Sequence, residues 1–242
     1  FMLIATILIV TRAGNRAGWH RRWLDNRHLA ERLRCLSVAA QLGELELRTG
    51  ADMRPGWVDW YTRATARAIG LPSARVDPAY LASVRDRLTT LVDDQIAYLH
   101  ADASRMHRLD HRLHNLGTIL FALTALVCIC LLAFKMADEI VGLAVLDTVA
   151  APFLTAATIA SAAFPAMGAA IYGIRMQGDF AGIAERSEGL AHNLTTLRAV
   201  IDADGVSFDT LRRRVARATD LMTRDLASWL QTYHARPLTL PG

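Results

Sequence analysis

Two long uncharged runs dominate the pattern of hydrophobic and polar positions along this chain. Residues 116–134 and 148–174 contain no Asp, Glu, Lys or Arg, and charged residues lie close to both ends of each run. As helices they would be about 28 Å and about 40 Å long, against about 30 Å for the hydrocarbon core of a bilayer. A helix satisfies its own backbone hydrogen bonds and can therefore cross lipid. The pattern predicts a transmembrane helical hairpin over residues 116–174, and the alternative is two core helices of a large soluble protein.

Helical spacing of apolar residues continues before the hairpin. Asp77 and Pro78 are typical of an N-cap and a first helical position. From there an apolar residue recurs every three or four positions, which predicts a coiled-coil-like stripe. The stripe consists of Leu81, Val84, Leu88, Leu91, Ile96, Leu99, Met106, Leu109, Leu113 and Leu116. No Gly or Pro interrupts it before Gly117, so we expect the helix to run directly into the first span.

The second span is expected to leave the hairpin in the same way, as one long helix. Its stripe continues through Phe180, Ile183, Leu190, Leu194, Leu197 and Ile201. A turn at residues 202–205 and a cap at Ser207 then predict a last helix. The apolar residues of that helix are Phe208, Leu211, Val215, Met222, Leu226, Trp229 and Tyr233.

The residues before Asp77 predict two further helices. One covers about residues 15–46, with apolar positions at Trp19, Trp23, Ala30, Leu33 and Ala40, adjoined by Leu29 and Leu36. After a break at residues 50–56, a short helix is expected over residues 57–69. No strand pattern of useful length is present, so the fold class is all-α: a membrane hairpin continuous with a cytoplasmic bundle of long helices.

The chain opens on ten apolar residues that are too few to span a bilayer. Arginines follow this run, whereas a signal peptide carries its basic residues before it. We therefore interpret residues 1–11 as the end of a further transmembrane helix that begins before Phe1. The expected organisation is that segment, cytoplasmic helices over 12–115, the hairpin over 116–174 and cytoplasmic C-terminal helices over 175–242.

Charges on either side of the hairpin predict its orientation. Arg105, Arg108 and Arg112 precede the first span and Arg175 follows the second. The connection over residues 135–147 holds one Lys against Asp138, Glu139 and Asp147. The positive-inside rule places both long flanks in the cytoplasm, which fits a multi-pass membrane protein.

Composition adds little that favours an enzyme. The chain has 242 residues, of which 52% are hydrophobic, and a net charge of +4, but its apolar residues are concentrated in blocks. It lacks a GxSxG, a P-loop, an HExxH and a paired-cysteine motif. Cys35, Cys128 and Cys130 have no disulfide or metal-ligand spacing. We expect no catalytic residues, no cofactor and no metal.

Four histidines share one face of the helix before the hairpin, namely His100, His107, His111 and His114. His107 and His111 have the i, i+4 spacing of a metal-binding pair. His107, His111 and His114 are also candidates for proton sensing close to the membrane. Because Arg108 and Arg112 lie among them, an interfacial face that meets anionic lipid is the preferred interpretation.

Basic and aromatic side chains near the predicted spans are candidates for contact with lipid headgroups. These are Arg12, Arg16, Trp19, Arg21, Arg22, Trp23, Arg108, Arg112 and Arg175. Nucleic acid would also require basic side chains. Proximity to a membrane span makes phospholipid the expected partner and argues against nucleic acid.

The second span is rich in small and hydroxylated residues. The candidates for helix packing or a pore lining are Thr155, Thr158, Ser161, Ala162, Ala166, Ala170 and Gly173. Repeated small residues at spacings of three and four let helices approach closely in lipid. The partner helix can belong to the same subunit or to another one, and a pore lined in this way would be only weakly polar.

Three segments together resemble the SLATT class of bacterial transmembrane effector domains: residues 19–34 (WHRRWLDNRHLAERLR), 57–72 (WVDWYTRATARAIGLP) and 95–117 (QIAYLHADASRMHRLDHRLHNLG). The resemblance implies a homo-oligomeric, pore-forming effector of antiphage defence. A nucleotide-sensing domain or partner of the SMODS or SLOG type would activate it and would lie outside these residues. The partial span before the cytoplasmic helices departs from the single hairpin of that class.

Two other functions stay open on the sequence. The hairpin can be a non-conducting anchor or scaffold for a cytoplasmic sensor or enzyme. A transporter is disfavoured because the predicted spans lack the intramembrane charges that normally mark a substrate or ion pathway.

Overall fold

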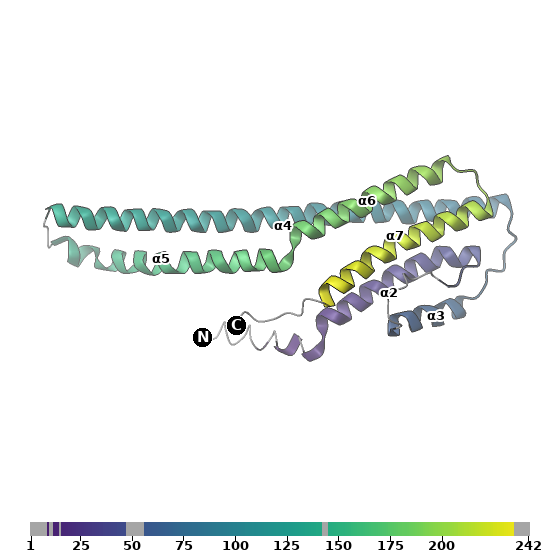
Figure 1. The fold of residues 1–242 in the computed structure, drawn as a ribbon, viewed down its shortest axis with the longest axis horizontal. Helices are drawn as coiled ribbons and strands as arrows, with labels where there is room; N and C mark the ends of the chain where they lie inside the picture. Colours follow the sequence, from purple (N-terminus) through teal and green to yellow (C-terminus); the bar gives the residue numbers. More distant parts are fainter. Residues whose placement is uncertain (1–8, 10–11, 15, 47–55, 142–144, 235–242) are drawn as a thin grey trace. The chain divides into compact units, whose positions relative to one another are not determined.

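The computed structural model describes residues 9, 12–14, 16–46, 56–141 and 145–234, and of residues 20–21, 138–141, 145–151 and 224–234 it describes the backbone only. In this part of the chain the regular secondary structure is helical, which confirms the all-α class. The helices are α2 (Trp19–Ala39), the 3-10 turn η1 (Ala40–Leu42), α3 (Trp57–Ile69), α4 (Pro78–Val141), α5 (Val145–Gly178), α6 (Phe180–Ala203) and α7 (Phe208–His234) (Figure 1).

The chain forms two compact units. The first, called here the bundle unit, comprises Phe1–Tyr98 and Gly189–Gly242, and the second, the hairpin unit, comprises Leu99–Glu188. Helices α4 and α6 each contribute residues to both. Three predictions fall wholly or largely outside the described residues: those for residues 1–11, for the break at 50–56, and for the side chains of Leu226, Trp229 and Tyr233.

Leucine, isoleucine and valine side chains from four helices form the core of the bundle unit. The largest fully buried ones are Leu24, Leu36, Val84, Leu88, Val92, Leu194 and Ile201. Helix α7 packs along α2, and Leu211, Val215 and Met222 of its predicted stripe are buried (Figure 1). The predicted cap of α7 is confirmed, because the backbone N–H of Thr210 donates to Ser207 Oγ at 3.3 Å.

The apolar stripe predicted for α2 is confirmed only towards its C-terminal end, where Leu36 and the following Ala40 are buried. Trp19 and Trp23 are 58% and 50% exposed, whereas His28 and Arg32 are buried on the same side as Leu24. Pattern reading counts Trp as apolar and His and Arg as polar. Here Arg32 is buried with an ion pair to Asp59 of α3, and His28 is buried in its neutral form.

Helix α4 confirms the prediction of one uninterrupted helix from Pro78 through the first apolar run. The backbone N–H of Tyr80 donates to Asp77 Oδ1 at 2.8 Å, which is the expected N-cap. Its buried stripe differs from the predicted one, because Val92 and Gln95 are buried where Leu91 and Ile96 were expected. The stripe loses its cover in the hairpin unit, where Leu109 and Leu116 are 37% and 47% exposed.

The second long helix is not continuous, contrary to the sequence prediction. Helix α5 ends at Gly178 and α6 begins at Phe180, and Asp179 between them has a positive φ of 46°. Asp and Gly are the residues that tolerate this left-handed conformation best. The connection between the two hairpin helices also differs, since α4 extends to Val141 and residues 135–141 are helical.

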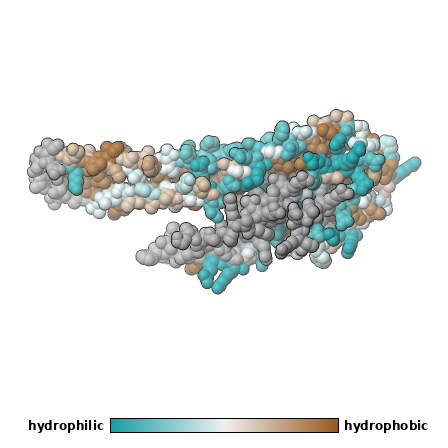
Figure 2. Space-filling model, viewed as in Figure 1, coloured by the Kyte–Doolittle hydropathy of each residue, from teal (hydrophilic) through white to brown (hydrophobic). Residues whose placement is uncertain are grey.

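The hairpin unit carries two helical stretches that are long and apolar enough to cross a membrane. They reach mean hydropathies of 2.6 and 1.5, and 6% of the first and none of the second is buried in the described structure. Brown and pale residues accordingly lie on the surface of this unit in Figure 2. The apolar character of these helices is thus exposed rather than used in a core.

Candidate functional site

A bidentate ion pair joins α4 and α5 at the end of the hairpin where both predicted spans meet charged sequence. Arg175 Nε and Nη2 donate to Asp110 Oδ1 and Oδ2 at 2.7 and 2.9 Å. The Asp110 side chain is 15% exposed and that of Arg175 is 32% exposed. Hydrogen bonds from Arg175 lower the pKa of Asp110, and the same bonds raise the pKa of Arg175. Both groups are therefore charged at any physiological pH.

Two of the three candidate proton-sensing histidines have partners near this ion pair. His114 Nδ1 lies 3.4 Å from Arg175 Nη1. His107 Nε2 lies 3.1 Å from Glu188 Oε1 and forms an ion pair with it when the imidazole is protonated. His111 is exposed. Across the described residues, no three His, Cys, Asp or Glu side chains converge as metal ligands.

Asp179 forms the corner between α5 and α6. Its carbonyl accepts the backbone N–H of Ile183 at 2.9 Å, and its carboxylate accepts a hydrogen bond from Arg186 at 3.3 Å. A Cβ at Gly182 would lie 2.5 Å from the Asp179 carboxylate, and one at Gly178 would lie 2.4 Å from the Phe180 ring. A side chain at either glycine would therefore displace the Asp179 carboxylate or the Phe180 ring. This corner lies four residues beyond Arg175.

The small residues of α5 point away from the rest of the hairpin unit. Ala162, Ala166, Ala170 and Gly173 are exposed, and a Cβ at Gly173 would meet no atom within 4 Å. These residues therefore do not serve close packing within the subunit. The candidate hydroxyl groups are directed at their own helix, since Thr158 donates to the Leu154 carbonyl and Ser161 to the Thr158 carbonyl, each at 2.8 Å. Thr155 is exposed as well.

The structure describes most of the predicted headgroup-contact residues, and their exposure is compatible with that role without testing it. Arg12, Arg16, Trp19, Arg22, Trp23, Arg108 and Arg112 are exposed, Arg175 is held by Asp110, and the Arg21 side chain is outside the description. Arg27 places its guanidinium over the rings of Trp23 and Tyr98, at 5.7 and 6.0 Å from their centroids.

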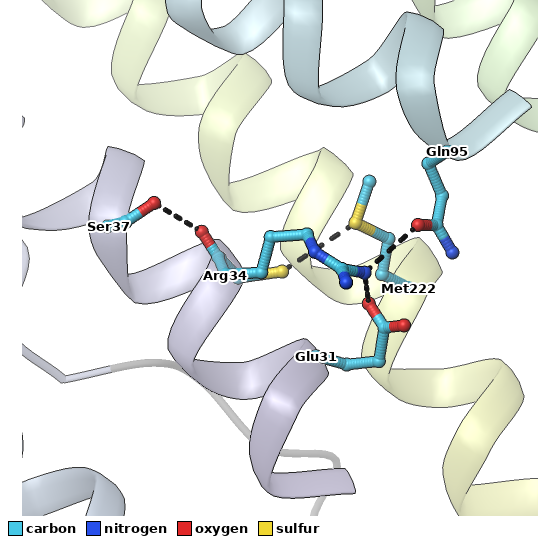
Figure 3. A network of polar contacts seen from close by, with 6 residues as sticks. Glu31, Arg34, Ser37, Gln95 and Met222 are labelled. Atoms are coloured by element: carbon cyan, nitrogen blue, oxygen red, sulfur yellow. Dashed lines mark hydrogen bonds and ion pairs between the residues drawn. The ribbon is translucent and has the colours of Figure 1, made fainter. Parts of the chain in front are cut away.

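A groove between α2 and α4 in the bundle unit was not predicted. It encloses about 590 Å³ and is lined by Trp23, Arg27, Glu31, Arg34, Asp94, Gln95, Tyr98 and neighbouring residues. Arg34 spans it, donating to Glu31 at 2.7 Å and to Gln95 at 3.2 Å, as Figure 3 shows. Two arginines and two carboxylates balance each other along this lining, so its charge selects no class of ligand.

A polar cluster between α2 and α3, buried at Arg32 and His28 and exposed at Trp57, was also missed. Arg32 is 3% exposed and donates to Asp59 at 3.0 Å, and the indole N–H of Trp57 donates to Asp25 at 2.9 Å. Burial, helped by Arg32, lowers the pKa of His28 to about 4, so this imidazole is neutral at physiological pH. The sequence signal for this cluster was the helical spacing of four positions on α2, namely Leu24, His28, Arg32 and Cys35.

Comparison with protein-family models, with curated proteins and with solved structures gives no significant match. The geometry of the hairpin unit and of the bundle unit is therefore the basis for assigning a function.

Proposed function

We propose that this chain is a multi-pass protein of a bacterial inner membrane whose hairpin acts as a membrane effector. The observation that carries the proposal is the exposure of the two apolar stretches. Only 6% and 0% of these two stretches is buried, whereas leucine and valine side chains of the bundle unit form a buried core. Lipid is the solvent in which such a surface is stable, since a soluble monomer rarely exposes a large apolar patch.

Oligomerisation through α5 is the second element of the proposal. The outward face formed by Ala162, Ala166, Ala170 and Gly173 has no partner among the described residues of the hairpin unit. Faces of this composition associate in lipid, where backbones approach closely across small side chains. Neighbouring subunits would therefore meet along this face.

A signal would reach the hairpin through α4 and through the base of α5. Helix α4 is uninterrupted between Pro78 and Val141, so movement at one end is transmitted along it. The Arg175–Asp110 pair holds α5 to α4, and the Asp179 corner is the place where α5 can reorient. Release of that pair lets the α5 helices of an oligomer shift and admit water.

The resemblance to the SLATT class supports the biological setting of the proposal. In that setting, a nucleotide-sensing domain or partner outside these residues activates the chain during phage infection. The oligomer then permeabilises the inner membrane, and the infected cell loses its ion gradients.

A non-conducting anchor is the alternative that one observation favours. Thr158 and Ser161 give their hydroxyl protons to their own helix, and the described part of α5 from Pro152 to Ile174 carries no charged residue. A surface of this kind does not by itself hold a column of water. The hairpin would then tether a cytoplasmic sensor or enzyme.

Ion leak distinguishes these two functions. The full chain, expressed with its genomic neighbours, is tested for membrane depolarisation in cells and for dye and ion release from proteoliposomes. The effector proposal predicts depolarisation on activation. Stable membrane retention without depolarisation under any activating condition would leave the anchor.

A further inference from the structure

Helix α3 packs its small side chains inward and its aromatic side chains outward. Val58, Thr62 and Ala66 are buried, whereas Trp57, Trp60 and Tyr61 are 48%, 69% and 45% exposed. The hydrophobic effect favours the opposite arrangement for a helix that serves only the core. Among the described residues, the rings of these aromatic side chains are thus left open to solvent.

The orientation of α3 is fixed by polar contacts with α2. Asp59 accepts a hydrogen bond from the buried Arg32 at 3.0 Å, and the Trp57 indole donates to Asp25 at 2.9 Å. These contacts lie on two sides of the first turn of α3. The outward direction of Trp60 thus follows from a defined packing arrangement.

Arginines lie beside the exposed aromatic residues. At about 100° per residue, Arg63 and Arg67 follow one edge of the sector that holds Trp57, Trp60 and Tyr61. The acidic residue of α3 is Asp59, which is already engaged by Arg32 and by Arg63 at 3.2 Å. We call Trp57, Trp60, Tyr61, Arg63 and Arg67 the α3 face. The segment after α3 extends it with exposed Leu71, Arg75 and Val76.

We propose that the α3 face is a docking surface for anionic lipid headgroups. Trp and Tyr are enriched at the headgroup level because each has an apolar ring and a polar group. Arg donates in a bidentate manner to phosphate, and a short amphipathic helix with this composition lies in the plane of a bilayer surface. The positive charge of the face is complementary to anionic lipid, whereas pairing with the same face of a second copy would bring like charges together.

This inference goes beyond the proposed function. It concerns the bundle unit and residues other than the hairpin and the arginines predicted to flank it. It does not depend on insertion of the hairpin, and it can be tested on the full chain whether or not the hairpin conducts.

The test uses a fluorophore sensitive to polarity at Ala68, an exposed position on the same side of α3 as Trp57 and Tyr61. The exposed Cys128 and Cys130 are replaced by Ala, and Cys35 stays because it is buried and burial raises its thiol pKa to about 12. The full chain with Ala68→Cys is placed in nanodiscs of phosphatidylcholine, with or without phosphatidylglycerol. Separate vesicles of both compositions are then added to the discs.

We expect the emission to move to shorter wavelength, and to be quenched by nitroxide-labelled lipid, when phosphatidylglycerol is present in the disc or in the added vesicles. Arg67→Glu should weaken this response at least about fivefold, since it replaces a lipid-facing positive charge by a negative one. Arg63→Glu, whose guanidinium also pairs with Asp59, should weaken it in the same direction. Trp60→Ala should weaken it as well. Arg213→Glu, a charge reversal at an exposed position of α7, is the matched control and should leave it unchanged.

Three results would overturn the inference: an emission that ignores phosphatidylglycerol in both arms, one that responds to protein concentration alone, and one that responds to a single-stranded oligonucleotide in place of lipid. Retention of the chain in the disc after an alkaline wash reports the proposed function separately. Retention without a lipid response at Ala68 removes only the inference about α3. A lipid response without retention removes only the proposed insertion.

Discussion

Arg175 and Asp110 face each other where the apolar parts of α4 and α5 meet charged sequence. Their two hydrogen bonds, at 2.7 and 2.9 Å, are short and bidentate. Because Arg175 lowers the pKa of Asp110, this contact is fully formed above the ordinary carboxyl range. It is lost only when the pH falls through the lowered value. It therefore acts as a constant tie at neutral pH.

Replacing Asp110 by Asn removes one charge of this tie. We expect the resting ion leak of proteoliposomes to rise about fivefold, which is the order of effect of a partly buried ion pair on a two-state equilibrium. Asp102→Asn changes a carboxylate on the same helix and should leave the leak unchanged. The exchange Asp110→Arg with Arg175→Asp should restore the low leak. A leak that stays elevated in the exchanged chain would show that the pair does not hold the hairpin closed.

His28 predicts a pH dependence of stability in the bundle unit. Its pKa of about 4 is below the ordinary 6.5, because burial and Arg32 disfavour the charged form, while Asp25 and Asp59 oppose this shift. Between about pH 6.5 and about pH 4, the His28 imidazole is therefore protonated in the unfolded chain and neutral in the folded chain. Stability is fully present above about pH 6.5 and decreases as the pH falls towards 4, by about 2 kcal/mol between about pH 7 and about pH 5.

Urea unfolding of the full chain in detergent, followed by tryptophan fluorescence, measures this slope. The five tryptophans lie outside residues 116–174, so the signal reports the bundle unit. His28→Gln should flatten the dependence on pH even if it lowers stability at neutral pH. His192→Gln, at an exposed position of α6, should keep the slope. An unchanged slope in His28→Gln would assign the pH dependence to other groups.

At the scale of elements, the corner at Asp179 separates α5 from α6. Gly182→Ala would place a methyl group 2.5 Å from the Asp179 carboxylate, a separation that real Cβ contacts do not adopt. We expect the corner to open towards a straight helix. Spin labels at the exposed positions 172 and 185 would then lie about 20 Å apart, the length of 13 helical residues, and closer in the parent chain.

Gly168→Ala is the matched control for this measurement, since a Cβ there meets no atom within 4 Å. The label separation in this variant should equal that of the parent chain. If Gly182→Ala also leaves the separation unchanged, the corner does not depend on the Asp179 carboxylate at its present position.

Sequence periodicity predicted the elements well where one signal acted alone. The N-caps at Asp77 and Ser207 and the unbroken course of α4 follow from local chemistry, because capping hydrogen bonds and the absence of Gly and Pro act within a few residues. The Asp179 corner was missed because these local signals do not report it. Gly178 and Asp179 interrupt a stripe whose apolar spacing continues across them, and spacing alone does not reveal a positive φ.

Long-range contacts decided what the sequence left undetermined in α2 and α3. Arg32 is buried only because Asp59, 27 residues away, is present to accept its hydrogen bond. Trp19 and Trp23 of the same helix are exposed. A single sequence gives no means of pairing Arg32 with Asp59, and so the predicted face of α2 was rotated and the exposed aromatic side of α3 was not recognised.

For the molecule as a whole, the hairpin unit has an exposed apolar surface, and small residues form one face of its helix α5. Ala166 and Ala170 lie on that face of α5 and are exposed. Acyl chains pack less well against a groove of small residues than another helix does, and close contact between backbones then favours association. The expected assembly places α5 of one subunit against α5 of its neighbour.

Ala166→Leu and Ala170→Leu fill this groove without removing any contact within the subunit. We expect each to shift the detergent-solubilised chain towards smaller oligomers and to lower the activated leak at least about tenfold, because a bulky side chain holds the helices apart. Ala125→Leu adds the same side chain at an exposed position of α4 and should change neither quantity. If assembly through this face opens the membrane, the yield of cross-linked oligomers and the activated leak should both fall in the α5 variants. Loss of oligomers with a full leak would separate conduction from the face, and a full oligomer with no leak would place α5 in the conducting path but not in the interface.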